Sequence, residues 1–214
     1  MRRFLGSSLT KKLVVALAGL FLIVFLLVHL AINFLLLKSD PSVFNSAAEF
    51  MASNIIIKVF EVVLLLVFLV HILVSVILQI QNWMARPTQY KVGTRSKTSF
   101  FSKYMIYLGA IILIFLVLHF FHFFFIKIGW IEGDSDNFYA IAHDLFKLPL
   151  YVSIYVISFV ALSFHLNHAF QSAFQTIGFN HQKYTPTVKF LGVLYSILIP
   201  AGYIVIPLII FLSE

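Results

Sequence analysis

Hydrophobic residues fill five long stretches of this chain, and the charged residues gather mainly in the short segments between them. A helix needs roughly 20 residues to cross about 30 Å of hydrocarbon, and each stretch is at least that long. We expect transmembrane helices at residues 13–37, 55–80, 104–126, 148–177 and 188–212. The stretches lack the strict alternation of barrel strands. The pattern predicts an all-α polytopic membrane protein, with residues 1–214 forming a single transmembrane domain.

Composition agrees with a membrane location. Of the 214 residues, 61% are hydrophobic and 11% are charged, whereas about a quarter of the residues in ordinary soluble domains are charged. A water-soluble domain is therefore excluded. The chain has no cysteine, which excludes disulfides, thiolate metal sites, iron–sulfur clusters and covalent attachment of a c-type haem.

The distribution of charge predicts the orientation. Five spans put the two termini on opposite sides of the membrane, and the side of the N-terminus carries 11 of the 15 Lys and Arg residues. The acidic residues fall on or near the other side. The positive-inside rule then predicts a cytoplasmic N-terminus and an external C-terminus. The net charge of +7 is attributed to this asymmetry rather than to nucleic-acid binding.

The external loops are expected to hold short interfacial helices. Asp40 and Pro41 form an N-cap and N1 pair. Ser46 and Glu49 have capping-box spacing, and residues 136–137 are expected to start another helix.

Histidines provide the candidate chemistry. Six of the eight lie inside predicted spans, namely His29, His71, His119, His122, His165 and His168. A single intramembrane histidine can form a hydrogen bond between helices. Ionisable residues in a membrane nevertheless mark function by default, and here one occurs in each of four successive helices.

Depth along the helices sorts four of these histidines into two pairs. A rise of 1.5 Å per residue puts His29 and His119 about 25 and 24 Å from the cytoplasmic edge. It puts His71 and His165 about 16 and 20 Å from that edge. The first and third helices run in one direction and the second and fourth in the other. Two haem b groups, each ligated by two histidines and stacked across the membrane, would require this arrangement.

Two helices contain a second histidine. Small side chains at i±4 and i±7 favour His165 over His168, namely Ser158, Ala161, Ala169 and Ser172. The simple depth estimate slightly favours His168. In the third helix the residue pattern does not separate His119 from His122.

Two glycines add support for a bound ring. Gly19 and Gly109 precede His29 and His119 by ten residues, or about 15 Å, which puts them near the depth of the other pair. They either make room for a macrocycle or allow close helix packing. The corresponding residues of the second and fourth helices, Glu61 and Tyr155, do not repeat this feature. The fifth helix has no histidine and is expected to be a peripheral packing helix.

Several stretches together resemble a known family. They are FLLVHLAIN around His29, FNSAAEFM from Phe44, LVFLVHILVSV around His71, NWMARPTQY from Asn82, FLVLHF around His119 and FHLNHAFQSAFQTIGFNHQKY from Phe164. The sequence resembles the bacterial five-helix, di-haem cytochrome b membrane anchor of succinate dehydrogenase and fumarate reductase. The resemblance covers nearly the whole chain.

The resemblance implies a ligand set. His29 and His119 would hold the distal haem iron, and His71 and His165 the haem iron nearer the cytoplasm. The family pattern thus selects His119 over His122. His122 and His168 then become candidates for hydrogen bonds to haem propionates or quinone, or for packing.

The resemblance also implies partners. A cytoplasmic flavoprotein would carry the dicarboxylate chemistry, and an iron–sulfur subunit would exchange electrons with this anchor, with residues 82–90 as a contact. Menaquinone or another quinone would be the lipid-soluble substrate, and the location would be the bacterial cytoplasmic membrane.

Glu61 is the carboxylate placed well inside the start of a span. If it faces the bundle, it is a candidate proton acceptor in quinol oxidation, and family members have an acidic group in a comparable region. Alternatively, Glu61 extends to the outer interface beside Lys58.

Other functions are compatible with part of the pattern. Cytochrome b anchors of hydrogenases or formate dehydrogenases use similar haem chemistry. Membrane desaturases and hydroxylases gather H-x-x-H pairs, as in HFFH at His119 and HLNH at His165, around two irons. Here those pairs lie in different leaflets without acidic ligands. A non-redox transporter or pure anchor would contain no pigment.

Overall fold

The computed structural model describes the backbone of residues 7–85 and 100–213. In this part of the chain, five helical spans are long and apolar enough to cross a membrane. They are Ser8–Leu37, Ile55–Met84, Tyr104–Lys127, Pro149–Thr176 and Thr185–Ser213. The predicted all-α membrane fold is confirmed, and every predicted span overlaps one of these helical segments.

Three spans are single α-helices, and two change helix type near one end. The single helices are α4 (Ile55–Met84), α8 (Pro149–Thr176) and α9 (Thr185–Ser213). The first span consists of α2 (Ser8–Asn33) followed by the 3₁₀ turn η1 (Phe34–Leu37). The third consists of α5 (Phe100–His119), the π-helical turn η2 (Phe120–Phe124) and α6 (Phe125–Lys127).

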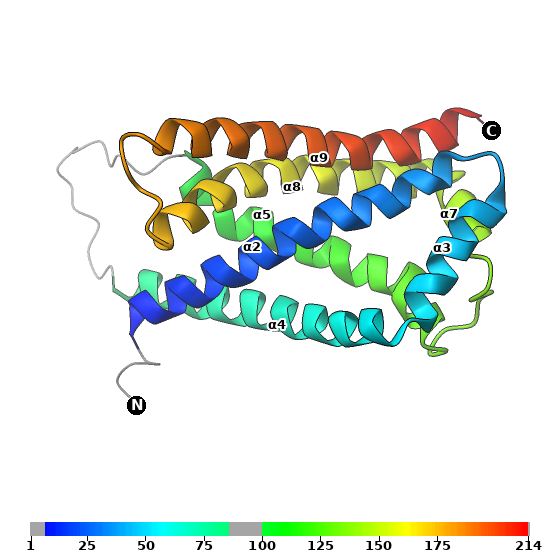
Figure 1. Ribbon diagram of the computed structural model, residues 1–214, viewed down its shortest axis with the longest axis horizontal. Coiled ribbons are helices and arrows are strands. Elements are labelled where there is room, and N and C mark those ends of the chain that lie inside the picture. Colours follow the sequence, from blue (N-terminus) through cyan, green and yellow to red (C-terminus); the bar gives the residue numbers. More distant parts are fainter. Residues whose placement is uncertain (1–6, 86–99, 214) are drawn as a thin grey trace.

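Two short helices, α3 (Pro41–Ser53) and α7 (Phe138–Phe146), lie between spans at one end of the bundle (Figure 1). Asp40 caps α3 as predicted, and its side chain accepts a hydrogen bond from the backbone N–H of Ser42 at 2.9 Å. Asn137 caps α7 by accepting from the backbone N–H of Ala140 at 3.2 Å. The predicted capping box at Ser46 is wrong, because Ser46 lies within α3.

The first four spans form a bundle in which neighbours along the chain are not always the closest neighbours in space. The close helix pairs are α2 with α4, α2 with α8, and α5 with α8. Among the described residues, α2 with α5, α4 with α8 and α4 with α5 are not closely packed pairs. The first and third spans therefore occupy one diagonal of the bundle, and the second and fourth occupy the other.

The fifth span, α9, packs along α8 and also contacts α2 (Figure 1). Its hydroxyl groups anchor it to α2: Tyr195 donates to the backbone carbonyl of Ile23 at 2.5 Å, and Tyr203 donates to that of Leu26 at 2.8 Å. Gly202 lets the two helices approach, because a Cβ there would lie 2.8 Å from Leu30 Cδ2. The helix thus lies outside the two diagonals and supports their packing.

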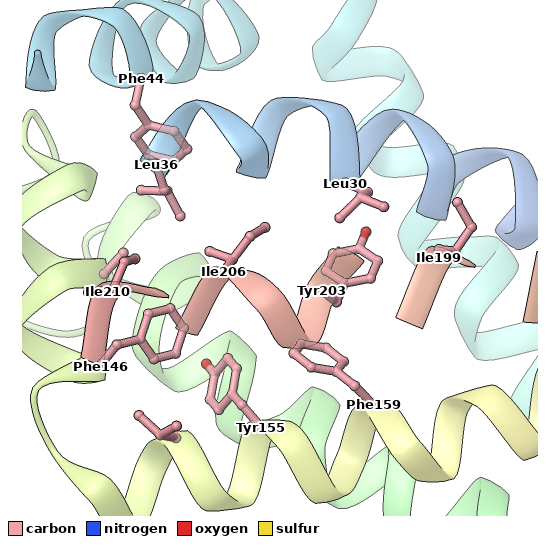
Figure 2. Packing of buried hydrophobic residues seen from close by; sticks show 12 residues of the cluster. Leu30, Leu36, Phe44, Phe146, Tyr155, Phe159, Ile199, Tyr203, Ile206 and Ile210 are labelled. Carbon is pink, nitrogen blue, oxygen red and sulfur yellow. The ribbon is translucent and has the colours of Figure 1, made fainter. Parts of the chain in front are cut away.

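The hydrophobic core is concentrated at the end of the bundle that carries α3 and α7. Figure 2 shows Tyr203 of α9 between Leu30 of α2 and Phe159 of α8. Phe44 of α3 and Phe146 of α7 belong to the same cluster. By contrast, the described parts of α4 and of the third span contain no buried residue. These two spans have the least protein around them.

Acidic residues gather at one end of the bundle, whereas the described lysines occur at both ends, with Lys38, Lys58, Lys127 and Lys147 at the acidic end. The start of α2 and the start of α9 lie at one end, and α3 and α7 lie at the other (Figure 1). The end with α3 and α7 carries the described acidic residues Asp40, Glu49, Glu61, Glu132, Asp134, Asp136 and Asp144. The opposite end carries Lys11, Lys12, Lys183 and Lys189. The basic residues at positions 2–3 and 86–97 used for the orientation lie outside the described residues.

Candidate cofactor-binding site

His29 and His119 face each other across the first diagonal, toward the end with α3 and α7. His29 lies on α2 and His119 is the last residue of α5. Their ring centroids are 5.9 Å apart and their ring planes are inclined at 85°. We call these two residues the distal pair.

His71 and His165 face each other across the second diagonal, nearer the opposite end. His71 lies on α4 and His165 on α8, with ring centroids 6.5 Å apart and planes inclined at 65°. A Cβ at Gly19 of α2 would lie 3.6 Å from His71 Cε1. We call His71 and His165 the proximal pair. Since Gly19 precedes His29 by ten residues on one helix, the two pairs are about 15 Å apart along the bundle.

Both ring separations fit a metal ion held between two imidazoles. An imidazole nitrogen binds a first-row metal ion at about 2 Å, which puts the centroids of two opposed ligating rings about 6 Å apart. The observed values of 5.9 and 6.5 Å lie on either side of that distance. Each diagonal therefore brings together two imidazoles that could hold one metal ion between them.

Three of these four rings have a buried nitrogen without a partner. Among the described residues, no hydrogen-bond partner exists for the Nδ1 atoms of His71, His119 and His165. The ring of His71 interacts elsewhere with the backbone of Val15. Unpaired polar atoms inside a protein are rare and costly, most of all in a membrane. Three of the four paired imidazoles therefore have a nitrogen that could accept a partner from outside the chain.

Glycines border the proximal pair, as their spacing predicted. A Cβ at Gly109 of α5 would lie 3.9 Å from His165 Cε1, and Gly19 stands against His71 in the same way. Neither glycine has a positive φ, so the backbone conformation does not require glycine at either position. A glycine inside a helix costs about 1 kcal/mol relative to alanine. A Cβ at either position would be in ordinary van der Waals contact with a histidine ring, so both glycines line the space beside the proximal pair.

Aromatic rings surround the distal pair. Phe25 stacks on His29 with centroids 5.1 Å apart, and Tyr203 lies 6.1 Å from His29 on another side. Phe115 and Phe123 lie 5.9 and 5.1 Å from His119. This shell is apolar apart from one tyrosine hydroxyl, which is engaged with α2. The two imidazoles of the distal pair therefore lie among mainly apolar rings.

The other two intramembrane histidines lie near the pairs, but neither makes a ring contact with a histidine of another span in the described part of the chain. The ring of His122 turns toward α8, where its Nδ1 shares a hydrogen bond with the Tyr155 hydroxyl at 3.1 Å. His168 is half-buried on α8, three residues from His165. Thus the structure brings His119, rather than His122, to His29, and it brings His165 to His71. The residue pattern alone did not separate the two histidines of the third span.

Glu61 forms an ion pair that neither sequence-based alternative contained. Its carboxylate lies on α4 and pairs with Lys127 of α6, at the end of the third span. Both side chains are partly exposed, at 24% and 29%. The pair joins the ends of two spans that are not closely packed along their length. Opposite charges at neighbouring ends of the second and third spans, Glu61 and Lys127, were the sequence signal that would have suggested it.

Sequence reasoning did not identify Tyr155, which contacts His122, or Tyr203, which contacts His29. In the sequence, Tyr155 was considered only as the position of the fourth span that does not repeat Gly19 and Gly109. Tyr203 lies on the fifth span, which has no histidine. Their contacts depend on how α8 and α9 rotate about their axes. Apolar sequences with residues of similar hydrophobicity all round do not fix that rotation.

The described residues contain no group of three or more His, Cys, Asp and Glu side chains that could hold a metal ion. No protein-family model, curated protein sequence or solved structure matches the chain. The candidate site therefore stands on its own geometry.

Proposed function

We propose that the protein is a di-haem cytochrome b that carries electrons through the membrane. The observation that carries the proposal is the pairing of four histidines from four spans into two diagonal pairs, with centroid distances of 5.9 and 6.5 Å. Haem b suits these pairs because it needs two imidazoles and no cysteine. When bound, each haem supplies a reversible one-electron carrier.

Four histidines would hold the two haems. His29 and His119 would ligate the distal haem, and His71 and His165 the proximal haem. Each imidazole would ligate iron through one of its ring nitrogens, and Gly19 and Gly109 would leave room for a macrocycle beside His71 and His165. The absence of buried residues in α4 and the third span is expected if part of their surroundings is not protein.

We further propose that this cytochrome is the membrane anchor of a succinate:quinone oxidoreductase in the bacterial cytoplasmic membrane. Two features of the sequence support this proposal. The stretches around all four histidines resemble those of this family of membrane anchors, and the end of the bundle that holds the N-terminus is rich in Lys and Arg. A flavoprotein and an iron–sulfur subunit would dock at that end, which would be cytoplasmic. Dicarboxylate chemistry would reside in the flavoprotein, and quinone, with menaquinone favoured, would react within the membrane. Of the proposed contact at residues 82–90, positions 86–90 lie outside the described residues.

Glu61 remains our candidate for the proton acceptor in quinol oxidation. Its carboxylate is partly exposed at the end of the bundle nearer the distal pair, where protons would be released. The ion pair with Lys127 fixes the carboxylate in place. Glu61→Gln should retain two haems but lose quinol turnover. Unchanged turnover with unchanged haem content would remove Glu61 from the mechanism.

Purification of the detergent-solubilised complex tests the proposed function as a whole. We expect a flavoprotein and an iron–sulfur protein to co-purify, with succinate-dependent reduction of a menaquinone analogue. Replacement of His71 or of His165 by alanine should abolish the same haem, and replacement of His29 or of His119 should abolish the other. Co-purification of a hydrogenase or formate dehydrogenase would instead assign the anchor to a different respiratory complex.

A further inference from the structure

The second histidine of the third span has a defined partner. Nδ1 of His122 and the hydroxyl of Tyr155 share a hydrogen bond of 3.1 Å, and their rings stack with centroids 6.2 Å apart at 23°. Tyr155 is 3% exposed, so its hydroxyl lies in the packed interface between the third span and α8. A hydrogen bond in such surroundings holds the His122 ring on the α8 side.

The backbone changes its winding between the two histidines. The π turn Phe120–Phe124 starts directly after His119, and the N–H of Phe125 bonds to the carbonyl of Phe120, five residues back. In a regular α-helix, residues three apart share one face, so His119 and His122 would point to the same region. A π turn inserts an extra residue into the winding, and such turns are frequent at functional sites. The π turn thus changes the angle between the two histidines, and the hydrogen bond to Tyr155 holds the His122 ring on the α8 side.

Tyr155 also touches the surroundings of the distal pair directly. Its ring meets Phe115 edge-on at 4.9 Å, and Phe115 in turn lies 5.9 Å from the ring of His119. Tyr155 therefore contacts both the ring of His122 and Phe115, which lies next to the ring of His119. Movement of Tyr155 would be transmitted to both histidines.

We propose that Tyr155 is a positioning residue that selects the distal ligand: its hydrogen bond holds His122 away from the bundle centre, so that His119 alone faces His29. The inference rests on the proposed function, since it concerns the ligand of the distal haem. Two histidines within one turn are alternative ligands for one iron. Without the bond, the distal site would contain two ligand sets, and ligand set and hydrogen bonding determine a haem potential.

Tyr155→Phe in the purified, haem-loaded complex tests this role. The variant keeps the ring and removes only the hydroxyl. We expect it to retain two haems per chain, while the distal haem gives a split or shifted low-spin electron paramagnetic resonance signal and a shifted midpoint potential. The signal and potential of the proximal haem should be unchanged.

Tyr151→Phe is the matched control. Tyr151 lies one turn earlier on α8, and its ring meets that of His122 edge-on at 4.9 Å. Among the described residues, however, the hydrogen bond of His122 is made with Tyr155. This variant should leave both haem signals as in the wild type.

His122→Leu removes the histidine that could compete for the distal iron, and it leaves the hydroxyl of Tyr155 in place. Alone, it should leave the distal haem signal unchanged, and combined with Tyr155→Phe it should restore a single distal signal. An unchanged distal signal in Tyr155→Phe, an equal shift in Tyr151→Phe, loss of the distal haem in His122→Leu, or no restoration in the double variant would each overturn the inference. A wild-type complex without two haems would instead refute the proposed function.

Discussion

Gly109 offers a direct way to test whether a ring occupies the space beside the proximal pair. The residue lies on α5 opposite His165, and valine in its place would put a branched side chain into that space. The perturbation adds no charge and removes no ligand. Any loss of cofactor would therefore come from the filling of space.

The size of the effect follows from the contact distances. A Cβ at position 109 would lie 3.9 Å from His165 Cε1, which is an ordinary van der Waals contact. A γ-carbon directed at the ring would be about 1.5 Å closer, whereas carbon atoms pack at about 3.5–4.0 Å. The imidazole would have to move by about 1 Å, and a functional site tolerates about 0.5 Å. Valine should therefore remove the proximal haem, and alanine should retain it.

The assay is the ratio of haem to protein, measured by pyridine haemochrome on purified material. Gly109→Val should lower the ratio from two to one, while the distal haem keeps its spectrum. Gly19→Val should remove the same haem, since its Cβ would lie 3.6 Å from His71 Cε1. The matched control is Ala110→Val, because Ala110 is the adjacent residue and is exposed on the outside of the bundle. It should retain both haems.

Retention of two haems with unchanged spectra in Gly109→Val would refute this reasoning. Loss of both haems together with loss of the folded protein would be expected of a packing glycine alone. Helical content measured by circular dichroism distinguishes that outcome from selective loss of one haem.

Three further predictions concern packing and capping. Lys127→Met and Glu61→Gln can be combined in a double-mutant cycle that measures the free energy of thermal unfolding in detergent. The coupling free energy between the two side chains should be no more than about 1 kcal/mol, because partly exposed ion pairs contribute little to stability. A coupling several times larger would contradict this. Ser163→Ala removes the 2.6 Å hydrogen bond from the serine hydroxyl to the backbone carbonyl of Ser196. The free energy of unfolding should fall by about 0.6 kcal/mol, a typical value for an interhelical hydrogen bond in a membrane. Unchanged stability would show that this bond contributes nothing. The hydrogen bond from the backbone N–H of Ser42 lowers the pKa of the Asp40 carboxyl. The carboxylate should therefore stabilise α3 at pH values above the ordinary carboxyl range, and this stabilisation should be lost as the pH falls through the lowered pKa. Hydrogen exchange in the first turn of α3 should show this loss in the wild type but not in Asp40→Asn.

The spans could be predicted from the sequence because bilayer thickness imposes a minimum length on any apolar helix. The caps at Asp40 and Asn137 could also be predicted, since capping depends on local residue types. Ser46 failed as a cap because the helix had already begun at Pro41, and a capping-box spacing does not exclude a position inside a helix. Several span ends extend beyond the predicted limits, as at Ser8, because helices continue past the apolar core, whereas Pro149–Thr176 lies one residue inside the predicted limits at each end.

The candidate site was only partly predictable. Depth along helices of known direction grouped the histidines correctly as neighbours in space, because that argument needs only the rise per residue. The sequence could not separate His119 from His122, because the π turn that redirects His122 leaves no pattern in an apolar, phenylalanine-rich segment. The Glu61–Lys127 pair was missed for a related reason: it joins two spans, and its formation depends on their separation and rotation.

Haem content and the visible spectrum of the purified wild-type protein test the central claim most directly. The two diagonal histidine pairs predict two haem b groups per chain, with sharp α and Soret bands on reduction and low-spin ferric signals that belong to bis-histidine ligation. A colourless protein that is folded and remains colourless after haem is supplied during expression would contradict the account.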